Sequence, residues 1–358
     1  MKPLIVPFFL AHRGCPHRCV FCDQVKIAGH ADEFPTAAEI LATIASYRRT
    51  AGRNRVEVAF YGGTFTALSR EAQERLLLPL QPLLAAGDLV GVRVSTRPDA
   101  VDAGIAAFLV ERGVNTVELG VQSMDDSVLG LAGRGHTAGT VNDACSALRG
   151  AGLRIGIQLM PGLPGDTLES SLDSFSRALN LCPDFLRIYP TLVISGTRLE
   201  ALYRQGDYVP LTVPDAVQLC KFMLHEALRA ALPVIRIGLQ STASLESVGA
   251  IVAGPYHPAF RQLVETELCY DLLLLLMEGV PHGDPLTIRC APGREADVAG
   301  HRRVNVRRLF HRQGVKINAI AADPALSHTE LTVEWGTGAR KGDMLQDIRY
   351  TSGGTAFV

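Results

Sequence analysis

The feature of this sequence that most limits its fold is a repeated alternation of short apolar runs with longer helix-like segments. The runs are rich in Val, Ile, Leu and Phe and are too short to be helices, so they predict β-strands. These runs occupy residues 4–10, 56–61, 92–95, 116–121, 154–159 and 185–190. Strand-then-helix repetition is typical of a parallel sheet covered on both faces, whose strands are apolar throughout. The sequence therefore predicts an α/β fold, either an open doubly wound sheet or an incomplete barrel of the TIM type.

The segments between these strands have the composition of helices. They lie at residues 37–50, 70–84, 101–112, 140–151 and 168–181. Ser69 and Asp99 are expected to cap two of these helices, because their side chains accept hydrogen bonds from free backbone N–H groups of a first helical turn.

The rhythm changes after about residue 232. A helix is expected near residues 258–278, and the strand-like sequences LTIRC and LTVEW follow it along the chain. We therefore expect one domain at residues 1–232 and a C-terminal extension at residues 233–358. The extension is a smaller α+β region and a candidate for substrate recognition.

Charge and hydropathy exclude several classes of protein. The formal net charge of the 358 residues is −1, so no global attraction to nucleic acid or to an anionic membrane is expected. The longest apolar run, 272–277, is far shorter than the roughly 20 residues that a membrane helix needs. The N-terminal run LIVPFFL is interrupted by Pro7 and followed by His12 and Arg13, which favours a buried strand over a signal peptide. We expect a cytoplasmic protein without membrane association.

Three cysteines stand close together in CPHRCVFC, directly after the first predicted strand. In parallel α/β folds, ligands bind at this end of the strands, so Cys15, Cys19 and Cys22 lie where chemistry is expected. A closed zinc site needs a fourth ligand, which His12 or His17 could supply. A 4Fe-4S cluster held by three thiolates instead leaves one iron free for a substrate or cofactor. Both interpretations stay open on the residues alone.

The cysteine loop, with Phe21 before its last cysteine, resembles that of the radical S-adenosylmethionine (SAM) enzymes. FYGGTFTAL, STRPD, ELGVQS, GRGHT, LMPGLPGDT and RIYPTLVISGT follow at successive strand ends. Together they resemble the radical SAM domain of the catalytic subunit of Elongator and its bacterial relatives. More loosely, they are similar to oxygen-independent coproporphyrinogen oxidase. The resemblance covers about residues 1–232 and implies an incomplete (β/α)6 TIM-like barrel.

The resemblance also implies cofactors and contacts. The three cysteines would hold a 4Fe-4S cluster whose open iron chelates SAM, and an external electron donor of the flavodoxin or ferredoxin type would drive cleavage of SAM to a 5′-deoxyadenosyl radical. The positions that match the family's cofactor contacts are Phe21, Gly62, Gly63, Thr64, Ser95, Gln122, Arg134 and Gln158. Thr64 departs from the acidic residue usual in the family. No residue is assigned to substrate chemistry, and Tyr61 and Tyr189 are expected to be wall residues rather than radical relays.

The substrate is left open by the sequence. The catalytic subunit of Elongator resembles a fusion with an acetyltransferase domain, and residues 233–358 do not resemble one, so wobble-uridine carboxymethylation is not carried over. A base in tRNA or another RNA is the leading expectation, and a small metabolite or tetrapyrrole is the second. A non-catalytic zinc or iron–sulfur binding protein is the alternative from another class. The basic stretch at 301–316 is similar in its β–α–β setting to a KH-like RNA module, although a solvated helix face explains it more simply. The oligomeric state stays open.

Overall fold

In the computed structural model, residues 3–28, 34–52, 55–281, 285–336 and 338–350 are described. They form two compact units, which we describe separately. Unit 1 contains Met1–Leu211 and Leu239–Gly254, and unit 2 contains Thr212–Gly238 and Pro255–Val358. Among the described residues, no helix is both long and apolar enough to span a bilayer.

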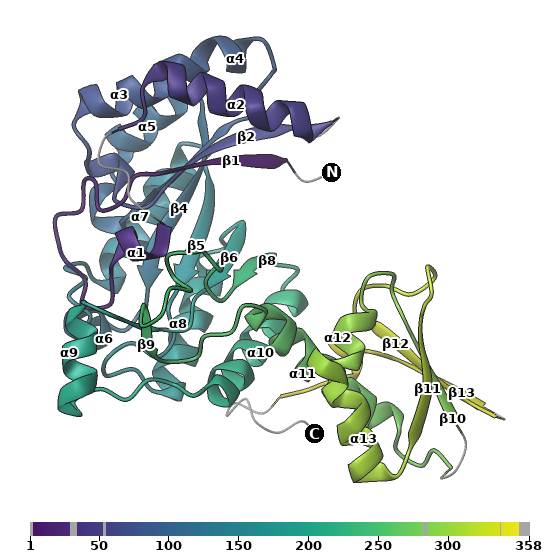
Figure 1. Ribbon diagram of the computed structural model, residues 1–358. Coiled ribbons are helices and arrows are strands. Elements are labelled where there is room, and N and C mark those ends of the chain that lie inside the picture. The colour runs from purple at the N-terminus through teal and green to yellow at the C-terminus, as the bar shows by residue number, and fades with distance from the viewer. Residues whose placement is uncertain (1–2, 29–33, 53–54, 282–284, 337, 351–358) are drawn as a thin grey trace. The chain divides into compact units, whose positions relative to one another are not determined.

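Unit 1 is built on parallel strands that lie side by side in chain order (Figure 1). These are β1 (Leu4–Phe9), β2 (Val56–Tyr61), β3 (Val92–Thr96), β4 (Val114–Gln122), β5 (Arg154–Leu159) and β6 (Phe185–Ile188). Each pairs in parallel with the next. The sheet is curled, as in an incomplete (β/α)6 barrel, which confirms the expected fold class. The predicted strands are all present, with small differences at their ends.

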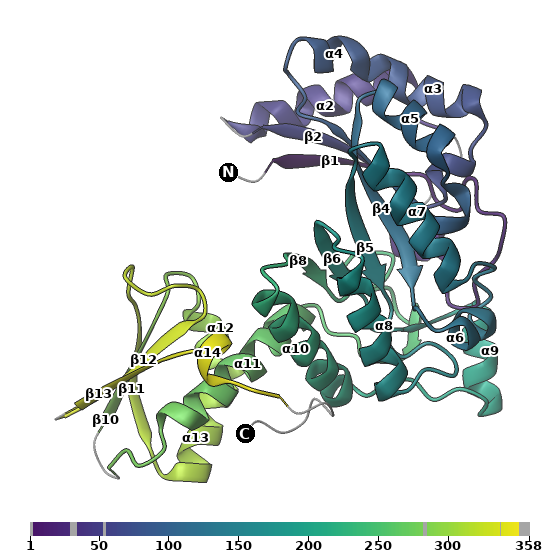
Figure 2. The ribbon, with the colours of Figure 1, turned by 180° about the vertical axis from the view of Figure 1, so that it is seen from behind.

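Helices connect the strands and cover the outer face of the sheet, as α5, α7 and α8 do in Figure 2. The helices are α1 (Gln24–Ala28), α2 (Ala37–Ala51), α3 (Arg70–Leu77), α4 (Gln81–Ala85), α5 (Ala103–Glu111), α6 (Asp126–Leu131), α7 (Ala138–Gly150), α8 (Leu168–Asn180) and α9 (Arg198–Gln205). A small antiparallel pair, β7 (Val193–Ile194) and β9 (Ile251–Ala253), completes the unit.

Two helix predictions need correction. The helix expected at 70–84 is divided into α3, a 3-10 turn and α4, because Pro79 and Pro82 lack the N–H groups that a continuous helix requires. Ser69 caps α3 as expected, accepting a bond from the amide of Ala72. Asp99, however, does not cap α5: Asp102 takes that role and accepts a bond from the amide of Ile105 (2.7 Å).

Unit 2 is an α+β region. Its elements are α10 (Val213–Arg229), β8 (Val234–Ile237), α11 (Phe260–Leu276), β10 (Pro285–Cys290), α12 (Glu295–Ala299), α13 (Val304–Gln313), β11 (Lys316–Ala322), β12 (Glu330–Trp335), β13 (Gly338–Asp343) and α14 (Met344–Asp347). Strands β11, β10, β12 and β13 form one mixed sheet, in which β10 and β11 are parallel. The strands β10 and β12 were expected from the sequence, whereas β11, which lies between them along the chain, and β13 were not.

Candidate active site

The loop after β1 carries the three cysteines. The amide of Cys15 donates to the carbonyl of His12 (3.3 Å), and the amide of Cys22 donates to the carbonyl of Cys19 (3.1 Å). Two of the three cysteines therefore close tight local turns. The loop lies at the carboxyl ends of the strands, as the sequence predicted.

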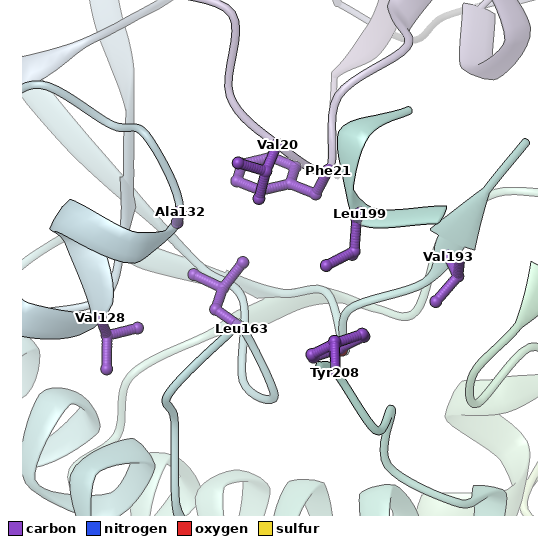
Figure 3. Close-up of a cluster of buried hydrophobic side chains, with 8 residues drawn as sticks. All are labelled: Val20, Phe21, Val128, Ala132, Leu163, Val193, Leu199 and Tyr208. Atoms are coloured by element: carbon purple, nitrogen blue, oxygen red, sulfur yellow. The ribbon is translucent and has the colours of Figure 1, made fainter. Parts of the chain in front are cut away.

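An apolar cluster anchors the middle of this loop (Figure 3). The amide of Val20 donates to the carbonyl of Ala132 (3.1 Å), and its carbonyl accepts from the amide of Leu199 (2.8 Å). The cluster consists of Val20, Phe21, Val128, Ala132, Leu163, Val193, Leu199 and Tyr208, and Cys19 and Cys22 pack against it. Phe21 lies inside this cluster, so its ring fixes the position of the cysteine loop.

Two cysteine sulfurs have polar partners from other strand ends. Cys15 Sγ lies 3.3 Å from the hydroxyl of Thr64, after β2. Cys19 Sγ lies 3.2 Å from Nη1 of Arg134 and 3.9 Å from Nη1 of Arg97. Guanidinium groups donate hydrogen bonds to anionic groups, so the surroundings of Cys19 suit a negatively charged group bound at its sulfur.

Burial is the largest influence on the pKa values of the other two thiols, Cys15 and Cys22. It raises the pKa of Cys15 and raises the pKa of Cys22 to about 12, while Arg134 opposes the rise at both. With nothing bound, these thiols are therefore protonated near neutral pH. A metal group that binds them must displace the protons, which couples its binding to pH.

The thiols do not form a site for a single ion. Among the described residues, no three His, Cys, Asp or Glu side chains converge closely enough for one metal ion. His12, a candidate fourth zinc ligand, accepts a bond from the amide of Gln24 at Nε2 (2.9 Å), and the ring of His17 packs against Gly135. Zinc needs each thiolate about 2.3 Å from one centre. A 4Fe-4S cluster instead binds each thiolate at a different iron, so its three thiolates need not meet at one centre.

The glycine pair after β2 lies against the cysteine loop. Gly62 and Gly63 have φ values of +75° and +61°. A Cβ on Gly63 would come within 2.2 Å of the carbonyl oxygen of Arg13 and 2.6 Å of that of Leu10. The amide of Thr64 donates to the carbonyl of Arg13 (2.7 Å). Only glycine permits this close approach, so the pair fastens the second strand end to the cysteine loop.

Two residues of this site, Gln24 and Arg97, were not expected from the sequence. Gln24 Oε1 accepts a bond from the amide of Gly63 (2.7 Å), and no motif marked this glutamine. Arg97 reaches Cys19 and is held by Asp99 through two bonds of 2.9 and 2.8 Å. The position of Arg97 directly after β3, inside STRPD, is the sequence signal that could have predicted it.

The ends of β4 and β5 bring three predicted contacts together. Gln122 has a φ of +73°, next to an irregularity in the strand register. The side-chain amide of Gln158 donates to the side-chain oxygen of Gln122 (3.3 Å). Arg134 donates to the carbonyl of Gly120, and its buried Nε has no hydrogen-bond partner in the described structure. A buried donor without a partner is costly, so this guanidinium suits a bound anionic group such as a carboxylate.

Charged residues line one face of the parallel strands. Arg93 on β3 binds Glu57 on β2 through two bonds (3.2 and 3.0 Å) and Glu118 on β4 (2.8 Å). Glu118 also pairs with Arg187 on β6 (2.7 Å). Ser95, half-buried, lies in register with Glu118. The expectation of strands that are apolar throughout is therefore wrong for this face.

Tyr61 and Tyr189 belong to the same network. Arg187 donates to the hydroxyl of Tyr61 (3.0 Å) and to that of Tyr189 (2.9 Å). Burial and the charge of Glu118 raise the pKa of Tyr61. Both hydroxyls are therefore held by Arg187.

Comparison with known proteins places this site in a family. Residues 10–177 match the family described as the radical SAM superfamily, and residues 183–269 match the radical SAM C-terminal domain. A tRNA uridine(34) acetyltransferase of Dehalococcoides mccartyi (strain CBDB1) is 30% identical over 231 residues, covering 55% of this chain and 50% of the relative. Elongator complex protein 3 of Saccharomyces cerevisiae is 29% identical over 243 residues, covering 55% and 43%.

A solved structure has the same fold. The archaeal Methanocaldococcus infernus Elp3 with an N-terminal deletion superimposes with a TM-score of 0.59 at 20% identity, covering 92% of this chain and 74% of that one. The chain spans about half the length of the curated relatives named above.

Members of the matched family bind a 4Fe-4S cluster and SAM. The described residues fit such a pair, because the loop after β1 carries three thiols and the guanidinium groups of Arg97 and Arg134 reach one of them, with the buried Nε of Arg134 left without a partner. The two family matches together cover more than half of the 358 residues. This chain belongs to the radical SAM superfamily.

Proposed function

We propose that this radical SAM enzyme modifies a base in RNA, with tRNA as the leading substrate. The relatives that it matches include proteins named for uridine 34 of tRNA. Both family matches concern the radical SAM part of the chain, so the proposal concerns radical chemistry and not acetyl transfer.

The observation that carries the radical chemistry is the pairing of the cysteine loop with Arg134. In the proposal, Cys15, Cys19 and Cys22 hold the cluster, and the free Nε of Arg134 holds the carboxylate of SAM. When bound, the two cofactors supply reductive cleavage of SAM to a 5′-deoxyadenosyl radical. The residues of this chain position the cofactors for that reaction.

Each strand end has a positioning role in this proposal. Gly63 and Gln24 keep the cysteine loop against β2, and the Thr64 hydroxyl donates to the Cys15 sulfur once that sulfur is a thiolate. Gln122 and Gln158, already bonded to each other, present amide groups suited to the hydroxyls of a ribose.

Three further residues were predicted as cofactor contacts: Gly62, Ser95 and Phe21. Gly62 is half-buried next to Gly63, Ser95 lies on the charged face, and Phe21 acts through the loop rather than by direct contact.

The proposal includes a reductant and a compartment. Enzymes of this superfamily need an electron source, and we propose a protein of the flavodoxin or ferredoxin type acting in the cytoplasm. We propose residues 1–232 as the catalytic part and residues 233–358 as the part that recognises the substrate.

The test of the radical chemistry is anaerobic reconstitution with iron and sulfide, followed by dithionite and SAM. The expected product is 5′-deoxyadenosine, measured by liquid chromatography. Cys19→Ala is expected to abolish it, whereas Cys182→Ala, at an exposed cysteine after α8, is expected to leave it unchanged. A fully loaded cluster that yields no 5′-deoxyadenosine under strict anaerobic conditions would contradict the proposal.

The test of the substrate is the nucleoside composition of RNA from cells that lack the gene. We expect one modified nucleoside to be missing, and to return when the wild-type gene, but not the Cys19→Ala gene, is restored. An unchanged nucleoside profile would exclude RNA and leave a metabolite or tetrapyrrole as the substrate class.

A further inference from the structure

The strongest concentration of charge in unit 2 is on and around α13. Residues 301–316 contain Arg302, Arg303, Arg307, Arg308, Arg312 and Lys316, and no acidic residue occurs between Asp297 and Asp323. The whole chain has a net charge of −1, so this segment is a local exception. Five of the six cations are arginines, whose planar guanidinium groups bind phosphate through two parallel hydrogen bonds.

Three of these arginines border a pocket. A hollow of about 460 Å³ lies between α11 and α13 and is lined by Tyr270, Val304, Arg307, Arg308, His311 and Arg312. We call it the α13 groove. A solvated helix face, the simpler explanation considered from the sequence, does not require a hollow lined by three arginines.

The arginines of the groove have different roles. Arg308 pairs with Glu267 through both terminal guanidinium nitrogens, one contact being 3.2 Å, and its Cζ lies 3.5 Å from the centroid of the Tyr270 ring. Its charge is therefore largely neutralised, and it forms the wall of the groove. Arg307 and Arg312 are exposed, so their charges are available to a ligand.

Neighbouring residues extend the same surface. The carbonyl of Arg302 accepts a bond from Nη1 of Arg307 (2.9 Å), so the turn before α13 lies next to the groove, and Arg302 and Arg303 are exposed there. Phe310 on α13 is 55% exposed and its ring contacts that of His311, which lines the groove. An exposed aromatic ring among arginines is typical of surfaces that combine phosphate contacts with base stacking.

We propose that the α13 groove binds the ribose–phosphate backbone of an RNA, with Arg307 and Arg312 contacting phosphates and Phe310 stacking on a base. This inference rests on the proposed function for its substrate class and assigns RNA recognition to a surface of unit 2. Arginine-rich chemistry and an exposed aromatic ring favour a nucleic acid over an anionic membrane or an acidic protein.

The experiment measures binding of the full chain to a fluorescently labelled tRNA transcript between 50 and 200 mM KCl. Affinity for wild type is expected to fall linearly on logarithmic axes, because each phosphate that an arginine neutralises releases counterions. The double variant Arg307→Gln/Arg312→Gln is expected to bind roughly tenfold more weakly, and its salt slope to decrease by about 0.7 to 0.9 for each phosphate that is no longer neutralised. Phe310→Ala is expected to weaken binding without changing the slope.

The matched control is Arg49→Gln/Arg75→Gln, which removes the same charge from exposed positions on α2 and α3 of unit 1. This control is expected to bind within about twofold of wild type. Formation of 5′-deoxyadenosine without RNA is expected to be unchanged in all of these variants, which separates failure of this inference from failure of the radical chemistry. The inference is overturned by a wild type without salt-dependent tRNA binding, by groove variants that bind like the control, or by binding to phosphatidylserine vesicles in place of tRNA.

Discussion

The arginines of the half-barrel and the arginines of α13 are the same residue type in opposite settings. In unit 1, Arg93 is buried and Arg187 is mostly buried, and both are bound to carboxylates or phenols at 2.7–3.2 Å. Arg307 and Arg312 in unit 2 are exposed at the border of a groove. A buried charge must be paired within the protein, whereas an exposed charge can bind an oppositely charged group of another molecule. The first set should therefore determine stability and the second should determine binding.

The largest expected effect comes from breaking the buried set. Arg93→Met replaces the guanidinium with an apolar side chain and leaves Glu57 and Glu118 without this shared partner. Removing one member of a buried ion pair costs about 3–5 kcal/mol, because the remaining charge stays desolvated. We expect this loss in the free energy of unfolding measured with urea. Arg49→Met on the exposed face of α2 is the control and should change stability by less than about 0.5 kcal/mol. Equal effects of the two substitutions would contradict the comparison.

The second effect tests the positive field around the cysteine loop. Burial, together with the charges of Arg134 and Arg97, lowers the pKa of His136 from 6.5 to about 4. Between these values the unfolded chain binds a proton that the folded chain does not, so stability present above pH 6.5 is lost as the pH falls towards 4. The loss approaches about 3 kcal/mol. In His136→Gln this part of the pH dependence should be absent from urea unfolding curves. A variant that keeps the wild-type pH dependence would show that His136 titrates normally.

The third prediction compares packing in the two units. Gly63 and Gly279 have similar φ values, +61° and +69°, but a Cβ on Gly63 would meet two carbonyl oxygens, whereas a Cβ on Gly279 would have no atom within 4 Å. Both Gly→Ala variants carry the backbone cost of about 1–2 kcal/mol. Gly63→Ala should cost roughly 2 kcal/mol more and should reduce the iron bound after reconstitution, because the cysteine loop must move. The iron content of Gly279→Ala should equal that of wild type.

The sequence was sufficient for the fold of unit 1 because its signals are local. Short apolar runs, capping residues such as Ser69 and glycines at strand ends depend on nearby residues, so they predict strands and loops correctly. The cysteine spacing and the motifs at successive strand ends likewise identified the superfamily. The proline-divided helix at 70–84 was predictable in principle, since Pro79 and Pro82 are visible in the sequence.

Other features depend on contacts between distant residues. Glu57, Arg93, Glu118 and Arg187 are scattered over four strands, and only the register of the sheet shows that they pair. Gln24 belongs to the cysteine loop because its side chain reaches Gly63, 39 residues away. In unit 2, the pairing of Arg308 with Glu267 could not be predicted, so the sequence does not distinguish the six cations of 301–316 from one another.

The smallest expected effects come from a comparison of two arginines on α13, Arg308 and Arg307. Arg308→Ala removes the ion pair with Glu267 and the packing against Tyr270, and should cost about 1 kcal/mol of unfolding free energy, since the pair is partly exposed. Arg307→Ala removes an exposed side chain and should cost less than about 0.5 kcal/mol, while weakening tRNA binding more than Arg308→Ala does. Paired measurement of unfolding and tRNA affinity on both variants separates the two roles. If the variant that loses more stability also loses more affinity, the arginine that forms the wall itself binds the ligand, and the distinction between paired and available charges fails within this helix.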